Sequence, residues 1–101
     1  MSRKEPVSIV TDDLKHCYIC KKFLGIDIDA VHIHHMCHGT ANRAVADREM
    51  IVCGLCGKCH SLLHDNNYHD LDLQQDAERA WLKYNNATIE DWIKIFGKNY
   101  L

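Results

Sequence analysis

Two C-x2-C pairs constrain this chain more than any other feature of its sequence. They are Cys17 with Cys20 and Cys56 with Cys59. Each short loop lets two sulfurs approach one ion from the same side, and two such pairs are typical of a tetrahedral Zn2+ site. The sequence therefore predicts a structural zinc ion that joins two segments lying far apart in the chain.

A second metal-binding pattern begins at the residue after Cys59. His60 and His64 are four residues apart in a stretch, Lys58–Asp65, that we expect to be helical. This spacing places both imidazoles on one face of a helix, where they can share an ion. Adjacent side chains on a helix do not face each other. We therefore expect Cys59 and His60 to serve two sites, one structural and one functional.

The remaining two cysteines are interpreted as structural. Cys53 makes the zinc register ambiguous, because it forms a further C-x2-C with Cys56. However, it belongs to Met50–Leu55, an apolar run that predicts a short buried strand, so we interpret it as a small buried hydrophobe. Cys37 is interpreted in the same way.

The length and composition favour one metal-stabilised domain. A chain of 101 residues buries little apolar surface, so a metal would supply stability. The first residues lack the apolar core of a signal peptide, and no stretch is long enough to span a membrane. We therefore expect a reducing, cytoplasmic compartment, where paired cysteines bind metal more often than they form disulfides.

The formal net charge of −2 argues against a protein that coats nucleic acid through many phosphate contacts. A local groove made positive by a bound metal ion is compatible with this charge. The nearest candidates for phosphate contacts are Arg43, Arg48 and Lys58, and each is equally compatible with an ordinary surface charge.

A strand is predicted upstream of the helix that carries the histidine pair. Ile26–Met36 alternates in polarity and is rich in β-branched residues. In a strand, His34 and His35 point to opposite faces, so one can bind a metal while the other addresses a different group. His32 shares the face of His34. We interpret it as a solvent-facing residue, with a supporting group or substitute ligand as the alternative.

The C-terminal third predicts two amphipathic helices. The first begins with Asp72, which with Gln75 resembles a capping pair, and ends near Asn85. The second runs from Thr88 to a stop at Gly97. Their apolar stripes indicate packing in the core, or an interface with a protein partner or a second copy of the chain. We expect one domain over 1–101, with a zinc-stapled core at 9–65 and a helical extension at 72–97.

The order of these elements resembles the HNH, or ββα-metal, endonuclease family. The matching features are a strand ending in His34-His35, a loop, a short strand and a helix with His60-x3-His64. The specific resemblance, over residues 17–64, is to small HNH proteins often carried by bacteriophages, and for a phage-encoded chain the expected compartment is the host cytoplasm. It implies an α+β fold with a treble-clef-like ββα-metal core, stapled by a four-cysteine zinc site and followed by the two helices.

The chemistry of the histidines agrees with the resemblance. Phosphodiester hydrolysis needs a deprotonated water and a Lewis acid at the phosphate. His35 is the candidate general base, and His34, His60 and His64 are candidate ligands of one catalytic divalent ion, which is Mg2+, Mn2+, Ni2+ or Zn2+. The family resemblance implies the same roles, DNA as substrate, and products with a 5′-phosphate and a 3′-hydroxyl.

The chain departs from the family pattern at one position. The family's central asparagine, which orients the base, should lie at the start of the second strand, and no asparagine stands there. Glu49 falls closest, and a carboxylate can orient His35 through its second ring nitrogen. Asn42 lies too early in the chain unless the loop folds back.

Two other function classes remain open from the sequence. The first is a non-catalytic zinc module that binds nucleic acid or a protein partner and keeps its histidines for stability. Metal stoichiometry distinguishes it from a nuclease, because such a module needs only the thiolate-bound ion. The second is a redox protein that uses a C-x2-C pair, which is disfavoured because the sequence offers no βαβ pattern.

Overall fold

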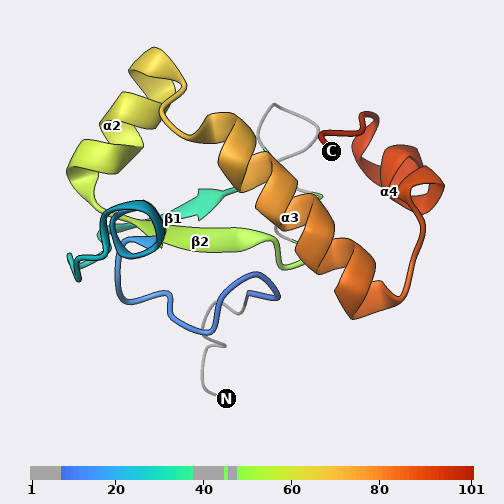
Figure 1. Cartoon of the computed structure of the whole chain (residues 1–101), viewed down its shortest axis with the longest axis horizontal. Helices are drawn as coiled ribbons and strands as arrows, with labels where there is room; N and C mark the ends of the chain where they lie inside the picture. Colours follow the sequence, from blue (N-terminus) through green and yellow to red (C-terminus); the bar gives the residue numbers. More distant parts are fainter. Residues whose placement is uncertain (1–7, 38–44, 46–47) are drawn as a thin grey trace.

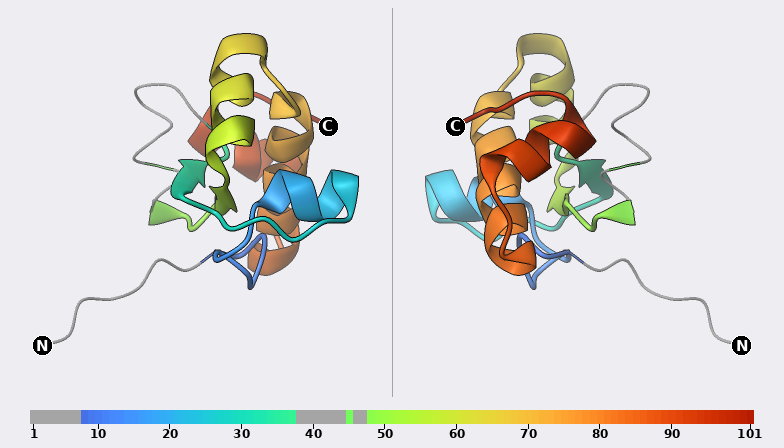
Figure 2. Two further views of the ribbon diagram at one scale, coloured as in Figure 1. Left: turned by 90° about the vertical axis from the view of Figure 1, so that its left-hand side faces the viewer. Right: turned by 90° about the vertical axis from the view of Figure 1, so that its right-hand side faces the viewer.

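The computed structural model describes residues 8–37, 45 and 48–101, and it has a small α+β fold. In Figure 1, one long helix crosses in front of a two-stranded sheet, and both side views in Figure 2 place that helix, α3, to one side of the strands. The elements in chain order are η1 (Cys20–Leu24), β1 (His32–His35), β2 (Val52–Leu55), α2 (Gly57–Asn66), α3 (Asp70–Asn85) and α4 (Ile89–Phe96).

The sheet consists of β1 and β2, which are antiparallel, with His34 opposite Cys53. The predicted continuous strand over Ile26–Met36 is wrong in length, because the chain changes partner before β1. The Ala30 N–H donates to the Lys15 carbonyl (2.8 Å), whereas the next N–H, that of Val31, donates to the Leu55 carbonyl on β2 (2.9 Å). The observed strand β1 therefore covers only His32–His35 of the predicted run.

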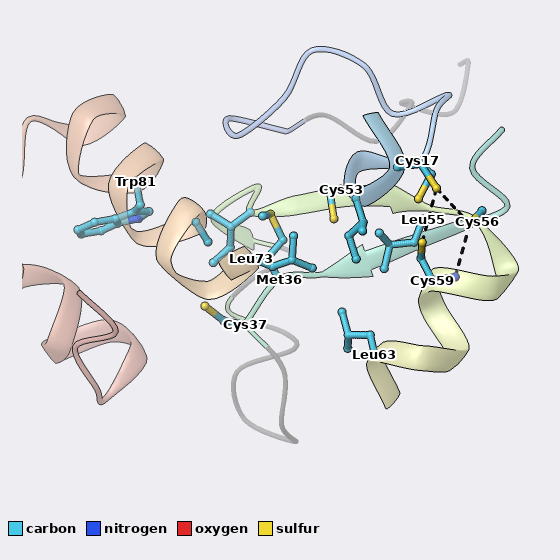
Figure 3. Packing of buried hydrophobic residues seen from close by; sticks show 14 of the residues in the cluster. Cys17, Met36, Cys37, Cys53, Leu55, Cys56, Cys59, Leu63, Leu73 and Trp81 are labelled. Atoms are coloured by element: carbon cyan, nitrogen blue, oxygen red, sulfur yellow. Dashed lines mark hydrogen bonds between the residues drawn. The ribbon is translucent and has the colours of Figure 1, made fainter. Parts of the chain in front are cut away.

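One buried core extends from the cysteine cluster to the helical extension. Figure 3 shows Cys17, Cys56 and Cys59 at one end of this core and Trp81 at the other. Cys37 and Cys53 are fully buried, which confirms their interpretation as buried residues. Burial raises the pKa of the Cys53 thiol and raises the pKa of Cys37 to about 12, so both thiols stay neutral.

The predicted start of the first C-terminal helix is wrong. Residues Asn67 and His69 adopt left-handed backbone conformations, and α3 begins directly after them at Asp70. Asp72 lies inside the helix and accepts a hydrogen bond from His69 Nδ1 (2.8 Å). Gln75 donates to the Tyr100 carbonyl (2.9 Å) and does not form a cap.

The second helix, α4, follows its prediction closely. Thr88 and Asp91 exchange hydrogen bonds in a capping box, and Gly97 ends the helix at φ 83°. The rings of Trp81 and Trp92 lie 5.7 Å apart, and both side chains are buried. The two tryptophans therefore pack inside the molecule and are not exposed platforms for stacking bases.

Gly54 on β2 is required by a close approach of the N-terminal segment. A Cβ at this position would lie 2.5 Å from the Leu14 carbonyl oxygen and 2.7 Å from Ala30 Cβ, and neither atom can swing away. We expect Gly54→Ala to lower the free energy of unfolding by about 1–3 kcal/mol or more, because overpacking forces the backbone to shift. Urea unfolding at fixed free zinc would measure the change.

Gly57→Ala is the matched control for this prediction. A Cβ at Gly57, the first residue of α2, would meet only Val31 Cγ2 at 3.9 Å, an ordinary contact. Alanine is also the better helix former by up to about 1 kcal/mol. Equal stability of the two alanine variants would contradict the close approach at Gly54.

Candidate metal centres

Four buried cysteines form the first candidate centre. Their sulfurs all lie within 4.8 Å of one another. Cys20 Sγ is 3.6 Å from Cys59 Sγ and 4.0 Å from Cys56 Sγ. A tetrahedral zinc with bonds of about 2.3 Å separates its sulfurs by about 3.8 Å, so the spacing and the donor type both fit this ion. The ligand set is Cys17, Cys20, Cys56 and Cys59, as the sequence predicts.

Local structure holds each pair in place. The first pair spans the start of η1, where the Lys21 N–H donates to the Cys17 carbonyl (3.0 Å), and the element ends at Gly25 in a left-handed conformation. In the second pair, Cys56 is the N-cap of α2, and its sulfur accepts the Cys59 N–H (3.4 Å). A thiolate at a helix N-terminus is stabilised by the free N–H groups and the helix dipole.

Burial and hydrogen bonds within the cluster shift the pKa values of its thiols in different directions. Desolvation raises the pKa of Cys20 to about 11 and also raises the pKa of Cys59. Desolvation opposes ionisation of Cys56 as well, but hydrogen bonds from the Cys59 backbone and from the neighbouring thiols lower its pKa overall. Cys20 and Cys59 are therefore protonated when no cation is bound, and zinc binding must release their protons.

Three histidines from two elements form the second candidate centre. His34 comes from β1, and His60 and His64 come from α2, with one ring nitrogen of each within 4.8 Å of the others. The Nε2 atoms of His60 and His64 are 3.1 Å apart, so both point toward the same place. Nitrogen ligands at about 2.0–2.1 Å from a tetrahedral ion are about 3.3 Å apart, so the arrangement fits a divalent transition ion.

The environment of the three histidines suits an open site. His34 is buried, with 4 % of its surface exposed, whereas His64 is exposed. Desolvation, followed by the charges of His64 and His32, lowers the pKa of His60. A lowered pKa keeps this imidazole neutral, with a lone pair available for a metal. One side of the cluster is thus anchored in the core, while the other is accessible to a ligand.

His35 lies on the other face of β1 from His34. Side chains alternate along a strand, and His35 is half-buried. Glu49, the predicted orienting carboxylate, accepts a hydrogen bond from the Trp81 indole (2.9 Å), and its other oxygen lies 3.5 Å from Arg48 Nε. The contact with Trp81 connects Glu49 to α3. Orientation of His35 by Glu49 stays a prediction.

The predicted phosphate contacts differ in where they lie. Arg48 and Lys58 are exposed, and Lys58 is in the first turn of α2, two residues before His60. Arg43, like Asn42, lies outside the described residues. Two lysines outside this predicted set, Lys21 and Lys22, form ion pairs with Asp13 and Asp76 respectively.

His32 is solvent-exposed, as predicted, but it also contacts a residue of the second centre. Its exposed ring stacks on His60, with centroids 4.5 Å apart and an interplanar angle of 27°. The signal was its two-residue spacing from His34, which places both side chains on one face of β1. That spacing cannot reveal which residue of α2 lies above His32.

Comparison with known proteins assigns no family. Searches with this chain find no matching family model, no matching curated protein and no matching solved structure. Among the described residues, no helix is both long enough and apolar enough to cross a bilayer.

Proposed function

We propose that this protein is a metal-dependent endonuclease of the HNH type that hydrolyses DNA phosphodiester bonds. The observation that carries the proposal is the convergence of His34 from β1 with His60 and His64 from α2, directly beside a four-cysteine cluster. A structural zinc site alone has no need of three clustered imidazoles. An accessible set of nitrogen donors is typical of a catalytic ion, which keeps positions open for water and substrate.

In this proposal one face of β1 contributes to metal binding and the other face carries the general base. His34, His60 and His64 would hold one divalent ion, which supplies Lewis acidity at the scissile phosphate when bound. His35 would take a proton from the attacking water, since an imidazole nitrogen that does not bind the metal can act as a general base. Glu49 would orient His35, and Lys58 and Arg48 would contact the DNA backbone.

The experiment is plasmid cleavage by the zinc-loaded chain in the presence of Mg2+, Mn2+, Ni2+ or additional Zn2+. We expect at least one ion to convert supercoiled DNA to nicked circles or linear DNA. DNA ligase should reseal the nicks, because the expected ends are a 5′-phosphate and a 3′-hydroxyl. A variant with His34, His60 and His64 all changed to Ala controls for a contaminating nuclease. Cleavage by none of the ions, or equal cleavage by this variant, would contradict the proposal.

A second candidate is a non-catalytic zinc module that binds nucleic acid or a protein partner. It is favoured by the net charge of −2 and by the ion pairs that occupy Lys21 and Lys22, which make these two cations less available to DNA. Metal content separates the two candidates. One ion per chain at saturating metal favours the module, and a second ion that activates plasmid cleavage favours the nuclease.

A further inference from the structure

The ring of His60 is contacted on three sides by other imidazoles. His64 and His34 approach it edge to face, with centroids at 4.5 Å and 5.7 Å. His32 instead lies nearly parallel to it, at 4.5 Å and 27°. The two edge-on rings belong to the ligand set, whereas the stacked ring does not.

The stack constrains rotation of the His60 ring about its bond to Cβ, which sets the direction of the ring nitrogens. The bond between Cβ and the imidazole ring has a broad torsional preference, so a histidine needs packing to fix the direction of its ring nitrogens. His32 covers the face of His60 and leaves Nε2, which points at His64 Nε2 (3.1 Å), uncovered. Turning the His60 ring would break the stack.

The backbone places His32 within reach of His60. His32 and His34 lie on the same face of β1, two residues apart, and His32 pairs with Leu55 shortly before α2 begins at Gly57. His60 is in the first turn of α2, so it reaches back over the strand to both residues. Among the described residues, the compact set of ligand atoms includes His34, His60 and His64 but not His32.

We propose that His32 is a positioning residue, whose ring stacks on His60 and fixes the direction in which that imidazole donates to a metal ion. This inference rests on the metal-binding part of the proposed function and is independent of DNA cleavage. The proposed contact is an aromatic ring stacked on an imidazole that a bound metal ion would make electron-poor. The nitrogens of His32 play no part in it. An aromatic hydrocarbon ring should therefore replace it.

The test compares His32→Phe, which keeps a flat ring, with His32→Gln, which keeps hydrogen bonding, and His32→Ala, which keeps neither. The four-cysteine site is first loaded with zinc, and Co2+ is then titrated and followed by its visible absorption. Sulfur-to-cobalt bands in the near ultraviolet would reveal any exchange into the thiolate site. The readout is the Co2+ dissociation constant, together with the NMR signals of the His60 ring.

We expect the Ala and Gln variants to bind Co2+ about 10-fold more weakly, within the range for loss of a group that orients a ligand, and the Phe variant to bind within about threefold of the parent. Before Co2+ is added, the NMR signals of the His60 ring should be sharp in the parent and in His32→Phe, and broadened in His32→Ala. Thermal unfolding of the zinc-loaded variants should match the parent, since His32 is exposed.

Parent-like affinity in His32→Ala would overturn the proposal, as would rescue by Gln but not by Phe. A parent that binds no Co2+ beyond the thiolate site would overturn both this inference and the proposed metal centre. A parent that binds Co2+ but cuts no DNA would contradict the nuclease alone, because the affinities of the variants still decide the role of His32.

Discussion

Cys56→Ser is expected to unfold the chain at room temperature. Cys56 contributes a sulfur of the cluster and is also the N-cap of α2; serine keeps a good N-cap, so the substitution isolates the loss of a zinc ligand. Binding of structural zinc is worth about 10–16 kcal/mol in small zinc domains. The whole stability of a domain is about 5–15 kcal/mol. Far-UV circular dichroism, with zinc content measured on the same sample, checks this prediction, and chelation of the parent should have the same effect.

Cys53→Ala is the matched control for the zinc prediction. Cys53 is also a buried cysteine, three residues before Cys56, but it faces the core and is not part of the cluster. The substitution should cost about 1 kcal/mol for the lost sulfur and leave one zinc bound per chain. A native spectrum in verified zinc-free parent, or loss of zinc in Cys53→Ala, would contradict the assigned ligand set.

His35→Ala is expected to abolish DNA cleavage while both metal sites remain filled. Removing a general base typically costs about 100- to 10,000-fold in rate. His64→Ala should instead weaken the second ion by about tenfold or more, with partial recovery of cleavage at high metal concentration, because a ligand is lost but the base remains. Cleavage rates and bound metal, measured across a metal titration, distinguish the two kinds of defect.

His16→Gln serves as the histidine control in this experiment. His16 lies outside the cluster and contacts Asp13 (2.8 Å), so its removal should leave cleavage within about twofold of the parent. If His35→Ala cuts DNA as fast as the parent does, the assignment of the base to His35 is wrong. If it cuts slowly only because it has lost metal, His35 is a ligand.

Short-range spacing explains which parts of the metal centres were predictable. Two cysteines separated by two residues, or two histidines four positions apart on a helix, can meet at one point whatever the rest of the chain does. The same holds for the capping box of Thr88 and Asp91 and for the stop at Gly97, which depend on neighbouring backbone groups. These features follow from a few consecutive residues.

Features that depend on tertiary pairing were harder to predict. The strand around His34 is short because Ala30 and Val31 donate to different partners, and a polarity pattern does not identify partners. Similarly, Asp72 and Gln75 have the spacing of a cap, but a left-handed turn at His69 starts the helix earlier. The stack of His32 on His60 joins two elements that are distant in the chain, so only the packing of α2 against β1 reveals it.

Because Cys59 and His60 are adjacent in α2, the two candidate metal centres share one turn of helix, and ions bound at both would be thermodynamically linked. Both residues lie in the helical turn that follows the Cys56 cap, so ordering this turn for one ion removes part of the entropy cost of binding the other. Linkage is reciprocal, so an ion bound by the imidazoles would raise the affinity of the thiolates for their ion by the same factor. In the proposed nuclease, zinc bound by the thiolates would therefore raise the affinity of the histidine site for its ion.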